Sequence, residues 1–307
     1  MYLQINPEDD LIIEMKKFIF GLVVIFASCY WCWGYFTHTH GEQVVQYEAS
    51  NKRCFGTIAT GKYCIHEAKQ GTNGAIAYHL HGRNLDEQAW NDDTFYTAML
   101  QRYWQDKGVK PPIVVTISFG PVWLLTSKGK SAYSGLLNTF IEKLIPEVES
   151  KIGVPTERIL FGESMGGLNA ILAGLKFPAS FKKIASLCPV IYKDVSPFSS
   201  YSEIFTAMNR TGAEPRIIWG IVGLAKNFIS DEDEWKKLAP LKLLADAQVD
   251  SAPVYYVSAP LYDKYGNYEG TDEFVHQAQQ KGLNVIWRPI YGGHCAVDIV
   301  SLGDFLL

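Results

Sequence analysis

The stretch that decides the fold is Gly-Glu-Ser-Met-Gly at residues 162–166. An apolar, strand-like run leads into it at residues 158–161, and an apolar run rich in Gly, Ala and Leu follows at 167–175. A G-x-S-x-G pattern between a strand and a helix predicts a nucleophile elbow, in which only small neighbours let the two elements approach closely. The turn exposes the serine oxygen, and the helix N-terminus favours developing negative charge. Ser164 is therefore the candidate nucleophile.

A serine of this kind needs a general base, and in this fold class the triad runs Ser, acid, His along the chain. Two histidines, His276 and His294, follow Ser164. His294 comes after the strand-like run 284–290, and the two glycines before it allow its imidazole to turn over the sheet edge. His276 lies inside a helical stretch, where a surface or packing role is the simpler interpretation. We therefore predict that His294 is the base.

The acid of the triad should lie on the loop after the strand that precedes the base. Asp263 occupies that place, after the apolar run 253–258. Asp272 is the alternative, although its surroundings are typical of a helix start, where acidic side chains interact favourably with the dipole. Asp298 and Asp304 follow the histidine, which is the wrong order for this fold. Asp263 is the predicted acid, with the role of orienting the imidazole.

An oxyanion hole of two backbone amides should complete such a site. One donor is the amide of Met165, directly after the nucleophile. The second should come from the loop after an early strand, and a buried-looking strand ends in His-Gly-Arg. Arg83 is the preferred second donor and Gly82 the alternative. We expect His79 and His81 to be structural and to order this turn by hydrogen bonds.

The elbow block at residues 161–167 resembles the putative-esterase family of α/β-hydrolases. That family includes esterase D (S-formylglutathione hydrolase), feruloyl esterases and the antigen 85 mycolyltransferases. Further matching residues follow the elbow: Ala170, Leu175, Phe177, Pro178 and Phe181. The stretch 140–149 is similar to the helix ahead of the family's elbow strand, and residues 235–241 resemble its late Pro-Leu helix. The matching segments follow one another in the same order as in the family and span roughly residues 74 to 300. Only the elbow block is specific.

This resemblance implies an α/β-hydrolase fold and ester chemistry through an acyl-enzyme. It assigns the nucleophile, acid and base to Ser164, Asp263 and His294, with two backbone donors for the oxyanion. It implies nothing about the acyl and alcohol parts of the substrate. The mycolyltransferase relatives imply that the same machinery runs acyl transfer when an alcohol replaces water.

Length and patterning favour a single α/β catalytic domain over residues 41–307. Strand-like runs alternate with long helical stretches, which predicts a mostly parallel sheet with helices on both faces. The runs lie at 76–81, 113–119, 159–161, 183–188, 254–258 and 284–290. The segment 192–250 is too long for a simple crossover. Its aromatic residues fit either a small helical cap over the serine or packing on the core.

The N-terminal residues 1–40 carry a second signal. An apolar run at 18–28 directly follows two lysines, which predicts a secretory signal peptide, with translation beginning at Met15 because the preceding residues are acidic. A membrane anchor is one alternative, since aromatic residues end the run. Lipidation at Cys29 is another. All three predict a catalytic domain exported from the cytoplasm.

Cysteine usage agrees with export. Cys54 and Cys64 flank a short turn-like stretch and are predicted to form a disulfide that closes a hairpin. Cys188 and Cys295 are interpreted as small apolar core residues. The spacing of Cys and His residues matches no metal site, so we expect neither a metal nor an organic cofactor.

The net charge of −4 and the sequence pI near 6.0 argue against binding nucleic acid. The sequence therefore predicts an exported serine esterase acting on a small-molecule or polymer-linked ester, with membrane association through the N-terminal segment as an option. An acyltransferase using the same triad is the first alternative. A non-catalytic surface protein with the same fold is the second.

Overall fold

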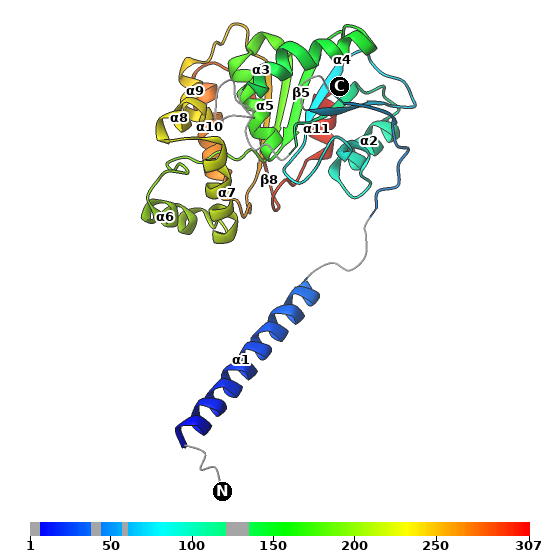
Figure 1. The fold of residues 1–307 in the computed structure, drawn as a ribbon. Helices are drawn as coiled ribbons and strands as arrows, with labels where there is room; N and C mark the ends of the chain where they lie inside the picture. Colours follow the sequence, from blue (N-terminus) through cyan, green and yellow to red (C-terminus); the bar gives the residue numbers. More distant parts are fainter. Residues whose placement is uncertain (1–6, 38–43, 57–60, 121–134) are drawn as a thin grey trace. The chain divides into compact units, whose positions relative to one another are not determined.

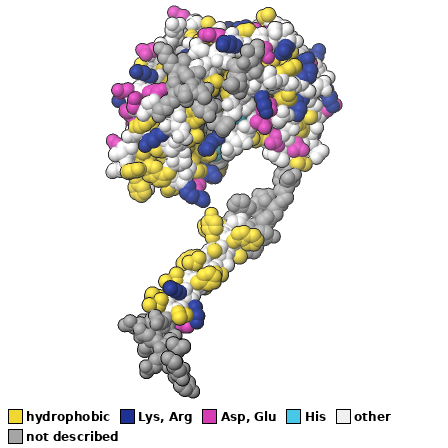
Figure 2. Space-filling view, viewed as in Figure 1, with side chains coloured by type: hydrophobic (Ala, Val, Ile, Leu, Met, Phe, Trp, Pro, Cys, Tyr) yellow, Lys and Arg dark blue, Asp and Glu magenta, His cyan; other side chains and the backbone are white. Residues whose placement is uncertain are grey.

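The computed structural model describes residues 7–37, 44–56, 61–120 and 135–307. The chain divides into two units, Met1–Val44 and Val45–Leu307. The first unit contains α1 (Pro7–Thr37), whose described side chains are largely apolar and exposed (Figure 2). Within the described residues, no helix combines the length and the apolar character needed to cross a bilayer. A secretory signal and lipidation at Cys29 stay predictions.

The second unit is built on one eight-stranded sheet (Figure 1). The strands are β1 (Asn51–Gly56), β2 (Lys62–Glu67), β3 (Ile76–Leu80), β4 (Ile113–Ser118), β5 (Arg158–Glu163), β6 (Lys183–Leu187), β7 (Val254–Pro260) and β8 (Val285–Ile290). Their order in the sheet is β1-β2-β4-β3-β5-β6-β7-β8. The pairs β1–β2 and β2–β4 are antiparallel, and every pair from β4 to β8 is parallel. The carboxyl ends of β3 and of β5 to β8 therefore meet at one edge.

Helices pack on both faces of the sheet. The helices of this unit are α2 (Tyr96–Lys107), α3 (Leu136–Thr139), α4 (Ile145–Ile152), α5 (Met165–Lys176), α6 (Tyr201–Thr211), α7 (Pro215–Phe228), α8 (Glu232–Leu238), α9 (Pro240–Leu243), α10 (Tyr268–Gln280) and α11 (Ile299–Phe305). A π-helical turn, Phe140–Leu144, joins α3 to α4, and short 3-10 turns lie at Ala89–Asn91, Pro178–Ser180 and Leu244–Asp246. Apolar side chains of α2 and α11 form one core cluster, and those of α4, α5 and α10 belong to the other.

Alternation along the central strands explains the two cores. In β3, Tyr78 packs into the cluster that contains α5, and its neighbour Ala77 packs into the cluster of α2 and α11. In β5, Leu160 and Phe161 divide in the same way. Successive side chains of a strand point to opposite faces, so a strand covered on both faces is apolar throughout. The predicted fold class is confirmed.

The long segment between β6 and β7 contains α6 to α9. Its aromatic residue Trp235 is buried in the larger core, whereas Trp219 on α7 is partly exposed. Ile221 and Leu224 of the same helix line a cavity that Ser164 also lines. The segment therefore does both things that the sequence left open: it packs on the core, and α7 supplies one wall of the space above the serine.

Strands β1 and β2 form an edge hairpin closed by a disulfide. Cys54 lies directly opposite Cys64 in the antiparallel register, and the two sulfur atoms are bonded. The register explains the bond, because opposite residues of an antiparallel pair bring their side chains together on one face. The structure thus contains the disulfide predicted from the sequence.

Candidate active site

Ser164 sits in a strained turn between β5 and α5. Its backbone dihedrals are φ 54° and ψ −112°, outside the regions that ordinary residues prefer. Such a conformation costs about 1–3 kcal/mol and persists only where the surroundings impose it. Here the Ser164 amide donates to the carbonyl of Leu187 on β6 over 2.8 Å. The serine is therefore fixed at the carboxyl edge of the sheet.

The glycines around Ser164 are required by close backbone approaches. A Cβ atom at Gly166 would collide with the carbonyl of Leu80, at the end of β3. A Cβ atom at Gly167 would lie 2.6 Å from the carbonyl of Leu187. Helix α5 therefore begins in contact with two strands, and any side chain at these positions would push it away from the sheet.

The structure brings Ser164, His294 and Asp263 together in a hydrogen-bonded chain. His294 Nε2 lies 2.9 Å from Ser164 Oγ, and His294 Nδ1 lies 2.8 Å from Asp263 Oδ2. The Asp263 side chain is fully buried, and its Oδ1 accepts the Tyr265 amide over 2.9 Å. Because the carboxylate accepts from Nδ1, Nε2 is left to accept the serine proton.

A tyrosine ring fixes the plane of the imidazole. Tyr265 stacks on His294 with ring centroids 3.8 Å apart and an interplanar angle of 25°. Tyr265 is held by the same Asp263 that bonds the imidazole. One short loop after β7 therefore orients His294 both from its edge and from its face.

The alternative residues lie elsewhere. Asp272 and His276 face each other on the exposed side of α10, with His276 Nδ1 2.9 Å from the Asp272 carbonyl. Asp298 caps α11 by accepting the Ser301 amide, and Asp304 pairs with Lys107. None of these four binds Ser164 or His294 in the part of the chain that the structure describes.

The two preferred oxyanion donors lie on either side of the serine. Met165 is the first residue of α5, so its amide has no partner within the helix. Arg83 lies in a turn closed by the Leu85 amide and the Gly82 carbonyl, in which Asn84 has a φ of 75°. Arg83 and Met165 both line the cavity above Ser164.

The alternative donor, Gly82, is already engaged. Its amide donates to Oε1 of Glu163 over 2.5 Å. Oε2 of the same carboxylate lies 2.8 Å from His79 Nε2 and accepts the Tyr96 hydroxyl over 2.9 Å. Three donors from β3, its following turn and α2 thus converge on the residue that precedes the serine, and Gly82 serves to fix the turn.

Both histidines of this region have structural partners, as expected. His79 is fully buried, stacks on Phe161 at 4.6 Å, and has Nδ1 3.3 Å from the Thr116 hydroxyl. His81 Nδ1 lies 2.7 Å from the Gly82 carbonyl, and burial lowers the pKa of His81. The contribution of Glu163 was not foreseen, because the first variable position of G-x-S-x-G, between the first glycine and the serine, carries no residue preference that reveals its partners.

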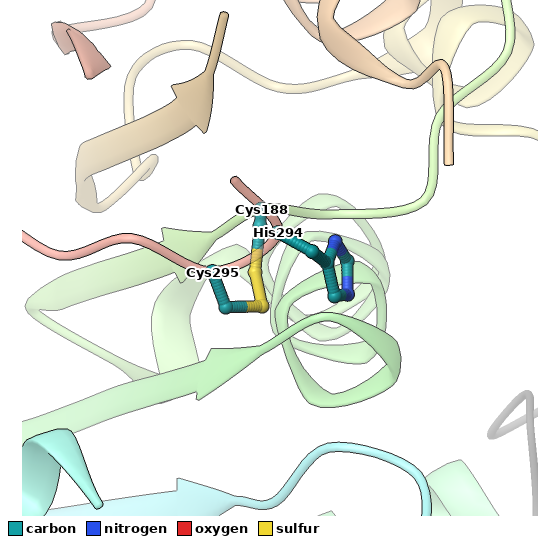
Figure 3. Close-up of side chains that lie close together, drawn as sticks. All are labelled: Cys188, His294 and Cys295. Atoms are coloured by element: carbon teal, nitrogen blue, oxygen red, sulfur yellow. A yellow bond between two sulfur atoms is a disulfide. The ribbon is translucent and has the colours of Figure 1, made fainter. Parts of the chain in front are cut away.

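A second disulfide lies next to the imidazole. Cys188, after β6, is bonded to Cys295, and Figure 3 shows this bond beside the ring of His294. Both cysteines pack in the core cluster of α2 and α11, as predicted, but the bond between them was not predicted. Both follow strands that end at the same sheet edge, and this shared position was the signal in the sequence that the two cysteines lie close together. Ligand atoms of the three side chains lie within 4.8 Å of one another, but sulfurs joined in a disulfide are not thiolates that bind metal.

The space above Ser164 is a cavity of about 330 Å³. Polar groups of the turn after β3 and of the triad contribute to its lining. Apolar side chains also line it, among them Val190, Ile221 and Leu224 from the segment after β6. A site of this volume and mixed lining accommodates a small organic substrate with its reacting carbon at the serine.

Comparison with known proteins agrees with this geometry. The family model described as "Putative esterase" matches residues 62–285, which include Ser164 and Asp263, while His294 lies beyond the match.

The chain belongs to this family.

Solved structures with the same fold are also esterases. A ferulic acid esterase superposes with a TM-score of 0.57 at 16% identity, covering 84% of this chain and 95% of that one. An arylesterase gives a TM-score of 0.62 at 13% identity and 87% coverage of both chains. An S-formylglutathione hydrolase from Agrobacterium tumefaciens gives a TM-score of 0.57 at 14% identity, covering 86% of this chain and 94% of that one. At such identities the likeness is one of fold, and no curated protein matches the sequence.

Family membership makes the protein a carboxylic ester hydrolase.

The Cys188–Cys295 disulfide is expected to hold the imidazole of the esterase in place. We predict that the double substitution Cys188→Ala, Cys295→Ala lowers kcat for a simple ester at least about tenfold, because a misplaced catalytic group is costly. Loss of the long cross-link should also destabilise the fold by up to about 5 kcal/mol. Steady-state kinetics below the unfolding temperature measure the first effect.

The matched control is Cys54→Ala, Cys64→Ala, which removes the other disulfide at the far edge of the sheet. This variant should lose up to about 3 kcal/mol of stability and keep its kcat. Equal kcat values for the two double variants would show that the bond at Cys295 does not position His294.

The Glu163 carboxylate is expected to hold the Gly82–Leu85 turn against the serine. We predict that Glu163→Gln lowers kcat about tenfold or more with little change in KM, since an amide cannot accept all three donors and loss of an oxyanion donor costs 10²–10³-fold. Circular dichroism melting should show a lower Tm.

Glu149→Gln is the matched control for this variant. Glu149 is also a buried carboxylate, paired with Arg158 at the start of β5 and with the Tyr78 hydroxyl in the middle of β3. Its substitution should lower Tm similarly and leave kcat near the native value. A parallel fall of kcat and Tm in both variants would mean that Glu163 acts through stability alone.

Proposed function

We propose that the protein is an exported serine esterase in which Ser164, His294 and Asp263 form the catalytic triad. The observation that carries the proposal is the continuous chain of hydrogen bonds from Ser164 Oγ through His294 to the buried Asp263 carboxylate. It lies at the strained turn between β5 and α5, on the side of the sheet where open α/β folds bind ligands. The esterase family supplies the reaction class.

The first half of the reaction makes an acyl-enzyme. Ser164 Oγ attacks the ester carbonyl carbon while its proton passes to His294 Nε2, and Asp263 stabilises the imidazolium that results. The amides of Met165 and Arg83 donate to the oxyanion of the tetrahedral intermediate. The intermediate collapses as the C–O bond to the alcohol breaks, and His294 returns the proton to the leaving oxygen.

The second half repeats these steps with water. His294 takes a proton from water, the hydroxide oxygen attacks the acyl carbon, and the same two amides donate to the second oxyanion. Collapse releases the carboxylic acid, and Ser164 recovers its proton from His294. All groups required for both halves belong to this chain.

Export is proposed on two grounds. Two disulfides occur among the described residues, and such bonds persist in oxidising compartments. The apolar run that follows Lys16 and Lys17 at the N-terminus has the composition of a secretory signal. Fractionation of the producing cells, with the protein detected by antibody, tests the location directly.

Ester hydrolysis by the purified protein tests the chemistry. We expect turnover of p-nitrophenyl esters, and we expect Ser164→Ala to lower kcat/KM by at least about 10³-fold with the fold intact. Asp263→Asn should cause a loss of about 10⁴-fold, because the amide stabilises the wrong imidazole tautomer.

Ser150→Ala is the control, since this exposed hydroxyl on α4 donates to the Glu147 carbonyl and to no other group of the described residues. It should leave turnover unchanged. Native-level hydrolysis by Ser164→Ala would remove the assigned nucleophile, and a folded native protein inactive on every ester would favour a non-catalytic role.

A further inference from the structure

Arg83 is the single formal positive charge among the described residues that line the Ser164 cavity. Its side chain is exposed, and its guanidinium has no carboxylate partner in the described part of the chain. Most other arginines of this unit do have one: Arg102, Arg158 and Arg210 pair with Asp106, Glu149 and Glu269. An arginine with free donors at a reaction cavity is available to a ligand.

The position of Arg83 ties its charge to the reacting centre. Its amide lies in the turn that faces Ser164, so its side chain starts beside the place where the ester carbonyl would bind. Burial and Asp263 raise the pKa of the Tyr265 phenol, while the positive charge of Arg83 acts in the opposite direction. Arg83 also lines the same cavity as Tyr265, the ring that stacks on His294.

The remaining charges near the cavity do not compete for an anion or neutralise Arg83. The Glu163 carboxylate is 2% exposed and bonded by three donors. Asp263 is buried behind His294. Glu214, whose charge also acts on Tyr265, pairs with Arg216.

Much of the remaining cavity lining is apolar. Val190, Ile221 and Leu224 come from the segment after β6, and none offers a polar side chain to a ligand. A bound ester would therefore meet both a cation and hydrocarbon. Guanidinium groups bind carboxylate and phosphate through paired, charge-assisted hydrogen bonds, and hydrocarbon favours an apolar group.

We infer that the preferred substrates are anionic esters, which carry a carboxylate, sulfate or phosphate near the scissile bond and an apolar group on the other side. Arg83 binds the anion, and the α7 wall binds the apolar part. This inference rests on the proposed function of Ser164. The protein has a net charge of −4, so the preference comes from local contact and not from the overall field.

Two matched pairs of esters locate the anion. In the acyl pair, 4-nitrophenyl hydrogen adipate is compared with 4-nitrophenyl hexanoate. In the alcohol pair, 4-carboxyphenyl hexanoate is compared with 4-carbamoylphenyl hexanoate. The readout is the ratio of kcat/KM for the anionic ester to that for its neutral partner, corrected for the spontaneous rates. We expect this ratio to be about ten in the pair whose anion reaches Arg83.

The substitutions are Arg83→Gln, Arg83→Lys and Arg83→Glu in the full chain. We expect the ratio to fall about tenfold in Arg83→Gln, to fall less in Arg83→Lys, which keeps charge but loses the paired donors, and to drop below one in Arg83→Glu. If a substitution disturbs the oxyanion turn, it changes kcat/KM for both esters of a pair, and this effect cancels in the ratio. Added salt should lower the native ratio, because a partly exposed ion pair is screened.

Lys226→Gln is the control, because Lys226 is an exposed cation on α7 that lies over Phe198, outside the cavity. Its ratio should equal that of the native protein. A native ratio near one in both pairs, or a ratio unchanged in Arg83→Glu, would overturn the inference. Those outcomes still leave Ser164-dependent hydrolysis of the neutral esters, whereas failure of the proposed function would show as turnover insensitive to Ser164→Ala.

Discussion

The site depends on one constraint: α5 begins so close to β3 that residue 166 has no room for a side chain. The Leu80 carbonyl occupies the place of a Cβ atom there, and the Leu187 carbonyl crowds the next residue. The chain can turn from β5 into α5 in this space only if Ser164 takes its strained conformation. The strain places the hydroxyl at the sheet edge and the Met165 amide beside it. The positions of the proposed nucleophile and of the proposed oxyanion donor are consequences of the same close approach.

Two further connections transmit this geometry to the rest of the site. Glu163 joins the elbow to the turn that carries Arg83, through the Gly82 amide, His79 and Tyr96. The Cys188–Cys295 disulfide joins the end of β6 to the residue after His294. Elbow, donor turn and imidazole loop come from distant parts of the chain, and each is fixed to a neighbouring strand. In the proposed mechanism, this preorganisation would let the amides and the imidazole act without rearranging during the reaction.

Local pattern was enough to predict six of the eight strands, all but β1 and β2, and where along the sheet edge Ser164, Asp263 and His294 lie. Each follows a strand, and parallel strands bring their carboxyl ends to one edge, so chain order implies proximity. Pattern could not reveal the partners of Glu163, because the contacts with His79 and Tyr96 depend on which faces of separate elements meet. The Cys188–Cys295 bond was missed because its 107-residue separation carries no local signal, although residues 41–307 contain an even number of cysteines.

The most direct test of the account is covalent modification by a fluorophosphonate, followed by intact-mass measurement and peptide mapping. The reagent phosphonylates a serine only where a base activates it and an oxyanion hole stabilises the adduct. We predict one equivalent per chain, attached to Ser164, with labelling absent in Ser164→Ala and much slower in His294→Ala. Attachment to a different residue, or full ester turnover by protein that resists labelling, would contradict it.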